Sequence, residues 1–164
     1  DQFPWLKRLF PDVGDYGRGP GPTVLETDGL KIGAQICYEG LFDWFTRSLA
    51  NQGAHLLVNL TNDSWYGKWE QPYQHAWMTF ARAIEVRRPL VRSTNTGIST
   101  VALSSGEIME LSPLHKEWFH LYEVPYYSQP VTTVFMSWGY WIFPSAFLLA
   151  LAWIAWGIRS KRRA

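Results

Sequence analysis

Residues 30–60 read LKIGAQICYEGLFDWFTRSLANQGAHLLVNL, and this stretch decides the fold. Apolar residues alternate over 30–37, which predicts a half-buried strand that ends at Cys37. Apolar residues then recur at helical spacing over 41–52, which predicts a helix. The apolar run HLLVNL over 55–60 predicts a buried strand.

The pattern continues on both sides of this stretch. Asp28-Gly29 separates 24–27 from 30–37, a spacing typical of a β-hairpin. Helical spacing returns over 72–86. Further strands are predicted at 90–93, 98–103, 108–111 and 120–124. Strands that alternate with helices indicate an α/β fold rather than an all-β fold.

Composition excludes several classes of protein. The chain has 164 residues, enough for one domain with a core, and its 18% charged and 16% aromatic residues exclude a disordered chain. A single cysteine excludes a disulfide scaffold. A net charge of +1 gives no reason to expect a nucleic-acid partner. The histidines and the cysteine show no metal-ligand spacing, and no cofactor is expected.

The C-terminal part has the pattern of a membrane segment. No Asp, Glu, Lys or Arg occurs over 124–158. Residues 138–158, WGYWIFPSAFLLALAWIAWGI, are long enough to cross a bilayer as a helix, with aromatic residues toward both ends. The alternative interpretation is a buried core helix. The positive-inside rule predicts a cytoplasmic location for the basic residues that follow, Arg159, Lys161, Arg162 and Arg163.

Cys37 is the best candidate for a chemical role. It lies between a predicted strand and a predicted helix, at the edge where sites in α/β sheets gather. Backbone N–H groups at such a position favour a thiolate and stabilise an oxyanion. The alternative is a small buried side chain, the common fate of a free cysteine. A nucleophilic thiol also needs a base, and His75 is a candidate.

Four segments carry a resemblance to a known family. They are ICYE at 36–39, NDSWYG at 62–67, RAIE at 82–85 and PLVRSTNTGIS at 89–99. Their order and spacing over 14–112, together with the apolar segment and basic tip, resemble the nitrilase-like domain of the apolipoprotein N-acyltransferase family. The wider nitrilase superfamily shares the strand-end cysteine, whereas these forms of the motifs point to the lipid-modifying branch.

The resemblance implies a partial nitrilase-like α-β-β-α sandwich followed by one transmembrane helix. It places the protein in the bacterial inner membrane, with the domain in the periplasm. The expected parts are the C-terminal portion of the catalytic domain at 1–123, an interfacial linker at 124–136, the transmembrane helix at 137–158 and a basic cytoplasmic tail at 159–164.

The resemblance also implies an activity and its site residues. Cys37 would take an acyl chain from a phospholipid as a thioester. The acyl group would then pass to the α-amino group of the N-terminal diacylglyceryl-cysteine of an apolipoprotein. Tyr38 and Glu39 match family positions needed for activity, and Asn62 and Trp65 match a loop that is expected to line the site.

One part of the family pattern has no match. The family uses a Glu-Lys-Cys triad in which the Glu and the Lys precede the Cys. Lys7, Lys31 and Glu26 are the only candidates before Cys37, and none has a family-like context. We therefore expect the chain to begin after the segment that bears the triad partners. We expect these 164 residues alone to be inactive, since an unassisted thiol is mostly protonated at neutral pH.

Two other functions fit the same residues. One is a membrane-anchored carbon–nitrogen hydrolase that cleaves a small amide. The other is a tail-anchored binding module without enzymatic activity, in which Cys37 is inert.

Overall fold

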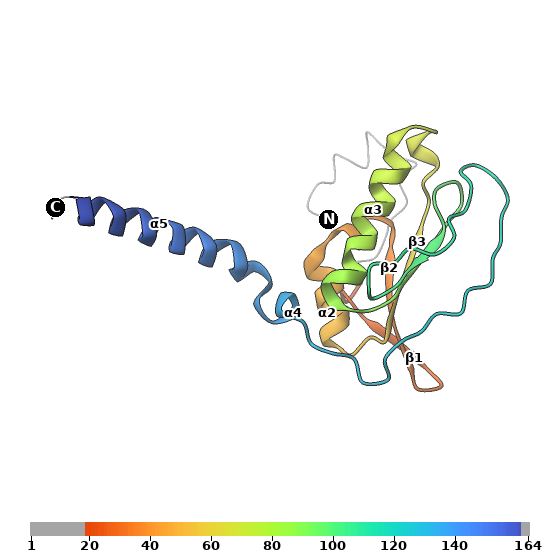
Figure 1. Cartoon of the computed structure of the whole chain (residues 1–164). Coiled ribbons are helices and arrows are strands. Elements are labelled where there is room, and N and C mark those ends of the chain that lie inside the picture. Colours follow the sequence, from red (N-terminus) through yellow and green to blue (C-terminus); the bar gives the residue numbers. More distant parts are fainter. Residues whose placement is uncertain (1–18, 162–164) are drawn as a thin grey trace, which may run out of the picture.

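The computed structural model describes residues 19–161, shown in Figure 1. Its strands and α-helices are β1 Val24–Thr27, β2 Leu30–Ile36, α2 Asp43–Asn51, β3 Leu56–Thr61, α3 Glu70–Val86, β4 Leu90–Thr94, β5 Thr100–Ala102, α4 Val134–Trp138 and α5 Ile142–Lys161. Three 3-10 turns lie between them, η1 Cys37–Leu41, η2 Ser64–Tyr66 and η3 Gly139–Trp141.

The strands form one mixed sheet in the order β1-β2-β3-β4-β5. The central strands β2, β3 and β4 are parallel, and the two outer strands pair antiparallel. In the register of the parallel strands, Ile36 pairs with Leu60 and Leu60 pairs with Ser93. The carboxyl ends of the three central strands therefore meet at one edge, and the segments that follow them lie together there.

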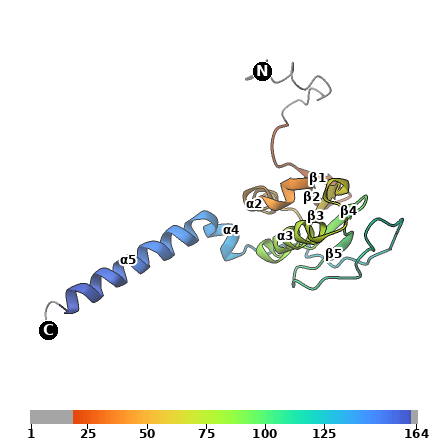
Figure 2. The same ribbon diagram turned by 90° about the horizontal axis from the view of Figure 1, so that it is seen from above.

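Helices α2 and α3 cover one face of this sheet (Figures 1 and 2). Strand residues on that face are buried, and the helices approach closely because Gly33 has no side chain: a Cβ there would lie 3.1 Å from the Cβ of Leu49. The opposite face carries no helix among the described residues, and Ile36 and Leu60 are exposed on it. The described residues thus form one helical and one sheet layer of the expected sandwich.

The structure confirms the predicted hairpin and the long helix. β1 and β2 pair through a turn in which Asp28 and Gly29 have φ values of 49° and 79°, and α3 covers the predicted range. The helix predicted over 41–52 begins only at Asp43, because the chain first forms η1.

Two of the predicted strands are wrong. Residues 108–111 make only an isolated bridge between Ile108 and Ala102. Residues 120–124 form no strand, and within the described chain no neighbouring strand pairs with them. Alternation is present there, but His120 stacks on the side chains of its own segment. Alternation alone does not supply the hydrogen-bond partners that a strand requires.

The apolar C-terminal segment is helical but interrupted. Residues Val134–Ile158 are long and apolar enough to cross a membrane, and none of the most apolar window is buried. The single helix predicted over 138–158 is corrected at its start, because η3 separates α4 from α5 at Gly139, which has φ 40°. Figures 1 and 2 show α5 projecting away from the domain.

Short helix α4 attaches this segment to the domain. Met136 is 5% exposed and packs in the core. The Thr133 hydroxyl accepts a hydrogen bond from the Met136 N–H at 3.1 Å, which caps α4, and donates to the Glu85 carbonyl of α3 at 2.7 Å. Arg47 of α2 lies 4.9 Å from the centre of the Tyr140 ring. The domain is thus held to the start of the apolar helix from both α2 and α3.

We expect Met136→Ala to loosen this attachment and to lower the free energy of unfolding by about 2–5 kcal/mol, because it leaves a cavity in the core. Thermal unfolding of the intact protein in detergent would measure the loss. Val134→Ala is the matched control, since Val134 lies in the same helix but is 74% exposed. Equal stability of the two variants would contradict the attachment.

Candidate active site

Cys37 occupies a sharp turn at the carboxyl edge of the sheet. Its φ of 51° lies in the left-handed region, which is uncommon for a residue other than glycine. Two side chains hold the turn: Glu39 Oε2 accepts a hydrogen bond from the Ile36 N–H at 2.7 Å, and Asn59 Nδ2 donates to the Cys37 carbonyl at 3.1 Å. The turn leaves Cys37 partly exposed. Such a strand-end turn presents a side chain away from the backbone, as a nucleophile requires.

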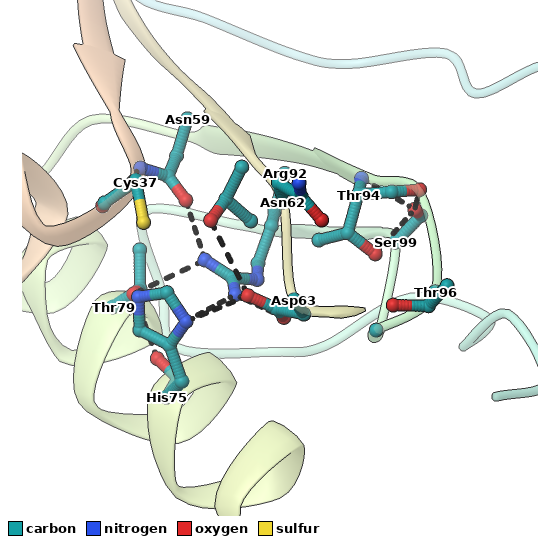
Figure 3. Close-up of polar contacts among 12 residues, drawn as sticks. Cys37, Asn59, Asn62, Asp63, His75, Thr79, Arg92, Thr94, Thr96 and Ser99 are labelled. Carbon is teal, nitrogen blue, oxygen red and sulfur yellow. Dashed lines mark hydrogen bonds and ion pairs between the residues drawn. The ribbon is translucent and has the colours of Figure 1, made fainter. Parts of the chain in front are cut away.

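A buried polar network lies beneath this turn (Figure 3). Arg92 of β4 is at its centre, with 1% of its surface exposed. Its guanidinium donates to Asn59 Oδ1, to Asp63 Oδ2 at 2.9 Å and to Thr79 Oγ1 at 3.3 Å. One side chain therefore links β3, β4, α3 and the loop after β3. Because Asn59 in turn bonds the Cys37 carbonyl, the network supports the backbone that presents the thiol.

Asp63 is the buried anion of this network. Its Oδ1 lies 2.9 Å from His75 Nδ1. Burial alone would raise the pKa of the Asp63 carboxyl, but the hydrogen bond from His75 and the charge of Arg92 outweigh burial, and the pKa lies below its ordinary value. Asp63 is therefore an anion that accepts from both neighbours. We assign the Nδ1 proton to His75 because a carboxylate can only accept there.

Two glycines allow the network to pack closely. A Cβ on Gly40 would lie 2.9 Å from Asn59 Nδ2 and 3.0 Å from Thr79 Cγ2, and a Cβ on Gly97 would collide with the Asp63 carboxylate. Any side chain at Gly97 would have to displace the anion. The glycines of the CYEG and NTG segments thus have a steric role in the site.

Tyr38 lies beside the turn rather than under it. Its ring centre is 5.2 Å from that of His75 and 6.4 Å from that of Tyr66. Burial, followed by the hydrogen bond and charge of Tyr38, raises the pKa of the Tyr66 phenol, which therefore stays a neutral donor. Next to these rings is a cavity of about 150 Å³, lined by Tyr38, Leu41, Tyr66, Gln71, Gln74, His75 and Met78.

The two residues predicted to line the site lie farther along the same edge. Asn62 Oδ1 accepts from the Ser64 N–H at 3.1 Å and from Asn95 Nδ2 at 2.6 Å, so its side chain braces the loop after β3 against the loop after β4. Trp65 projects from η2 with 79% of its surface exposed. The structure gives neither side chain a contact with Cys37, and their lining role stays a prediction.

The triad candidates of the described chain lie away from Cys37. Lys31 pairs with Glu26 across the β1–β2 hairpin, at the start of β2. Cys37 follows six residues later, or about 20 Å along an extended strand. Lys7 lies outside the described residues. Among the residues that the structure describes, no three His, Cys, Asp or Glu side chains are grouped so as to hold a metal ion.

The helix predicted after Cys37 does not begin directly at the thiol. The residues after it form η1, a five-residue 3-10 turn, so the N-terminus of a full α-helix does not face the thiol. The structure also adds residues that the sequence reading missed, namely Asn59, Asp63, Thr79 and Arg92. A signal for two of them was present: Asn59 and Arg92 are polar residues in apolar strands, each two positions after a leucine that is buried on the same face, Leu57 and Leu90.

The fold and the strand-end cysteine define a class of protein. Residues 4–121 match the carbon-nitrogen hydrolase family, and the chain belongs to this family. Individual relatives allow a more specific comparison than the family match does. The apolipoprotein N-acyltransferase of Bdellovibrio bacteriovorus is 53% identical over 145 residues, which cover 86% of this chain and 26% of that protein.

A second relative agrees with the first. The apolipoprotein N-acyltransferase of Geobacter metallireducens is 42% identical over 115 residues, covering 70% of this chain and 22% of that protein. The chain thus spans about a quarter of the length of these curated relatives.

Solved structures support the fold. A carbon-nitrogen hydrolase from Helicobacter pylori G27 has a TM-score of 0.53 and 18% identity, covering 62% of this chain and 43% of that one. An amidase from Nesterenkonia sp. has a TM-score of 0.51 and 21% identity, covering 61% and 40%. At these identities the likeness shows a shared α/β fold.

We expect Asp63→Asn to lower the free energy of unfolding by about 3–5 kcal/mol at pH 7, because it leaves the Arg92 charge buried without its anion. Since folding lowers the pKa of Asp63, its contribution is complete above the unfolded value of about 3.9 and is lost as pH falls through the folded value. The difference between the variant and the parent should therefore shrink below pH 4.

Denaturant unfolding of the intact protein in detergent at pH 7 and at pH 3 measures both effects. Asp28→Asn is the control, because Asp28 is exposed in the hairpin turn and asparagine tolerates its positive φ. A stability difference for Asp63→Asn that is the same at both pH values would contradict the ionised state of Asp63.

Proposed function

We propose that the protein carrying this sequence is an N-acyltransferase. It moves an acyl chain from a phospholipid, through a thioester on Cys37, to the α-amino group of the N-terminal diacylglyceryl-cysteine of apolipoproteins. The observation that carries the proposal is the turn at Cys37: a partly exposed thiol at φ 51°, at the carboxyl edge of parallel strands, held from beneath by a buried network.

The chemistry divides into two steps. In the first, the Cys37 sulfur attacks the ester carbonyl of the phospholipid, so that a C–S bond forms, the ester C–O bond breaks and the lysophospholipid leaves with a proton. In the second, the amine attacks the thioester, so that a C–N bond forms and the C–S bond breaks. The thiol is restored with the proton that the amine loses. A covalent intermediate replaces one difficult transfer by two easier ones.

The relatives support the acyl acceptor as well as the reaction class. The proteins from Bdellovibrio and Geobacter are both named apolipoprotein N-acyltransferase. Both substrates of such a reaction are lipids, and an exposed apolar helix joined to the domain would hold the site at a bilayer. We place that helix in the bacterial inner membrane, the domain in the periplasm and the basic tail in the cytoplasm.

We assign roles to the residues near Cys37 from their positions in the site. Glu39 is a positioning residue, because its carboxylate closes the turn through the Ile36 N–H. Tyr38 forms a wall of the cavity beside the thiol. Asn62 and Trp65 line the approach from the loop after β3, where the exposed indole of Trp65 is suited to the membrane interface.

The test uses the intact protein in membranes, with a phospholipid that carries a labelled acyl chain. We expect the label to appear on the protein as a hydroxylamine-sensitive thioester, and to be absent from Cys37→Ala. Addition of a diacylglyceryl lipopeptide should discharge the label onto the peptide amine. Cys37→Ala fills the same turn with a smaller side chain, and Thr23→Ala at an exposed position is the matched control.

Three outcomes would overturn the proposal. Label that survives Cys37→Ala would remove Cys37 as the nucleophile. Ammonia release from small amides, without acyl transfer to the lipopeptide, would favour the amidase instead. A Cys37 that reacts with neither labelled lipid nor amide would support the binding module.

A further inference from the structure

One ring nitrogen of His75 takes no part in the proposed two-step reaction at Cys37. The side chain is buried, with 4% of the residue exposed. Its Nδ1 lies 2.9 Å from Asp63 Oδ1 and 3.1 Å from Arg92 Nη2, whereas its Nε2 has no hydrogen-bond partner within residues 19–161. In the neutral imidazole with its proton on Nδ1, Nε2 carries a free lone pair and is an acceptor. A buried acceptor left unpaired is unfavourable and rare in native proteins, which points to a donor supplied from outside.

The side chain that carries this nitrogen lines the cavity next to Tyr38. His75 lines that cavity together with Tyr38 and Tyr66. In the view of Figure 3 the imidazole has one nitrogen toward Asp63 and Arg92, and the other on the side where the Cys37 sulfur lies. A negative charge on Cys37 would raise the pKa of both Arg92 and Tyr66, so the Cys37 side chain lies near these groups.

The cavity has the size and the walls for a small donor group. Its volume of about 150 Å³ accommodates a few heavy atoms. Apolar contact comes from Leu41 and Met78, and the polar groups are the phenols, the amides of Gln71 and Gln74, and His75. Of these, the imidazole is the one held in place by a buried anion, since Asp63 fixes the ring through Nδ1.

The chemistry of the two substrates shows which of them needs this acceptor. The reacting ester of a phospholipid offers only oxygen acceptors, so it has no hydrogen to give to Nε2. An amine that attacks a thioester must direct its lone pair at the carbonyl carbon, and its N–H bonds then point away and need an acceptor. A fixed imidazole nitrogen next to the thioester meets that requirement and orients the amine.

We propose that His75 Nε2 accepts a hydrogen bond from the N–H of the primary amine that attacks the Cys37 thioester. The cavity is then the binding site of the amine terminus of the acyl acceptor, and His75 acts in the second half-reaction only. This inference rests on the proposed function, because it presumes a thioester on Cys37.

Two substitutions separate the two nitrogens of His75. His75→Asn keeps a side-chain N–H near the position of Nδ1, so it can still donate to Asp63, but it has nothing at Nε2. His75→Gln extends an amide to the position of Nε2, so it restores an acceptor there and gives up the bond to Asp63. His120→Asn is the matched control, on a histidine that stacks on Trp118 in another part of the domain.

The experiment follows each half-reaction in the intact protein. Thioester formation is measured with labelled phospholipid, and discharge is measured by adding a diacylglyceryl lipopeptide to the labelled protein. We expect His75→Asn to form the thioester at the parent rate and to discharge it at least about tenfold more slowly, with a raised KM for the lipopeptide. His75→Gln should recover part of the discharge rate, and His120→Asn should change neither step.

The outcomes distinguish this inference from the proposed function. If the parent protein forms no thioester, the proposed function fails. If the thioester forms and His75→Asn discharges it normally, the acceptor role of His75 is overturned. If His75→Gln is the slower variant in both steps, and loses thermal stability where His75→Asn does not, His75 serves only to hold Asp63, and the inference is wrong. Faster discharge to water than to lipopeptide in the parent would also overturn it.

Discussion

The site depends on one buried ion pair, between Asp63 and Arg92. Two opposite charges withdrawn from water are favourable only when their remaining hydrogen-bonding capacity is used, and here most of it is, although the Arg92 Nε–H has no partner among the described residues. Arg92 donates hydrogen bonds to Asn59 and Thr79 as well as to Asp63. The Asp63 carboxylate also accepts a hydrogen bond from His75. The pair joins two parallel strands, a helix and a loop at the edge where Cys37 lies.

This arrangement explains why the turn at Cys37 can persist. A left-handed cysteine is strained by roughly 1–3 kcal/mol, and such strain survives only where neighbours over-determine the backbone. Asn59 provides that constraint from below, since its amide bonds both the Cys37 carbonyl and the Arg92 guanidinium. Glu39 provides it from above. The network therefore fixes the position of the thiol without contacting it.

The sequence predicted the elements whose signals are local. Alternation, helical spacing and the Asp28-Gly29 turn defined β1, β2 and α3, and Cys37 stood out because a strand ended there. The network could not be predicted in the same way. Arg92 and Asp63 are 29 residues apart, and only the parallel register of β3 and β4 brings their side chains together. The turn η1 was also not predicted, because the Glu39 carboxylate that accepts from the Ile36 N–H at its start gives no periodic signal in the sequence.

Helix α3 connects the site to the membrane segment. His75 and Thr79 face the network from one part of the helix, and the Glu85 carbonyl near its end accepts from Thr133, which caps α4. His75 and Glu85 are ten residues apart, or about 15 Å along the axis of α3. The segment that precedes α5 is held from two sides, because α3 contacts the N-cap of α4 and α2 contacts Tyr140 of η3. Helix α3 therefore takes part both in the network beneath Cys37 and in the attachment of the apolar segment.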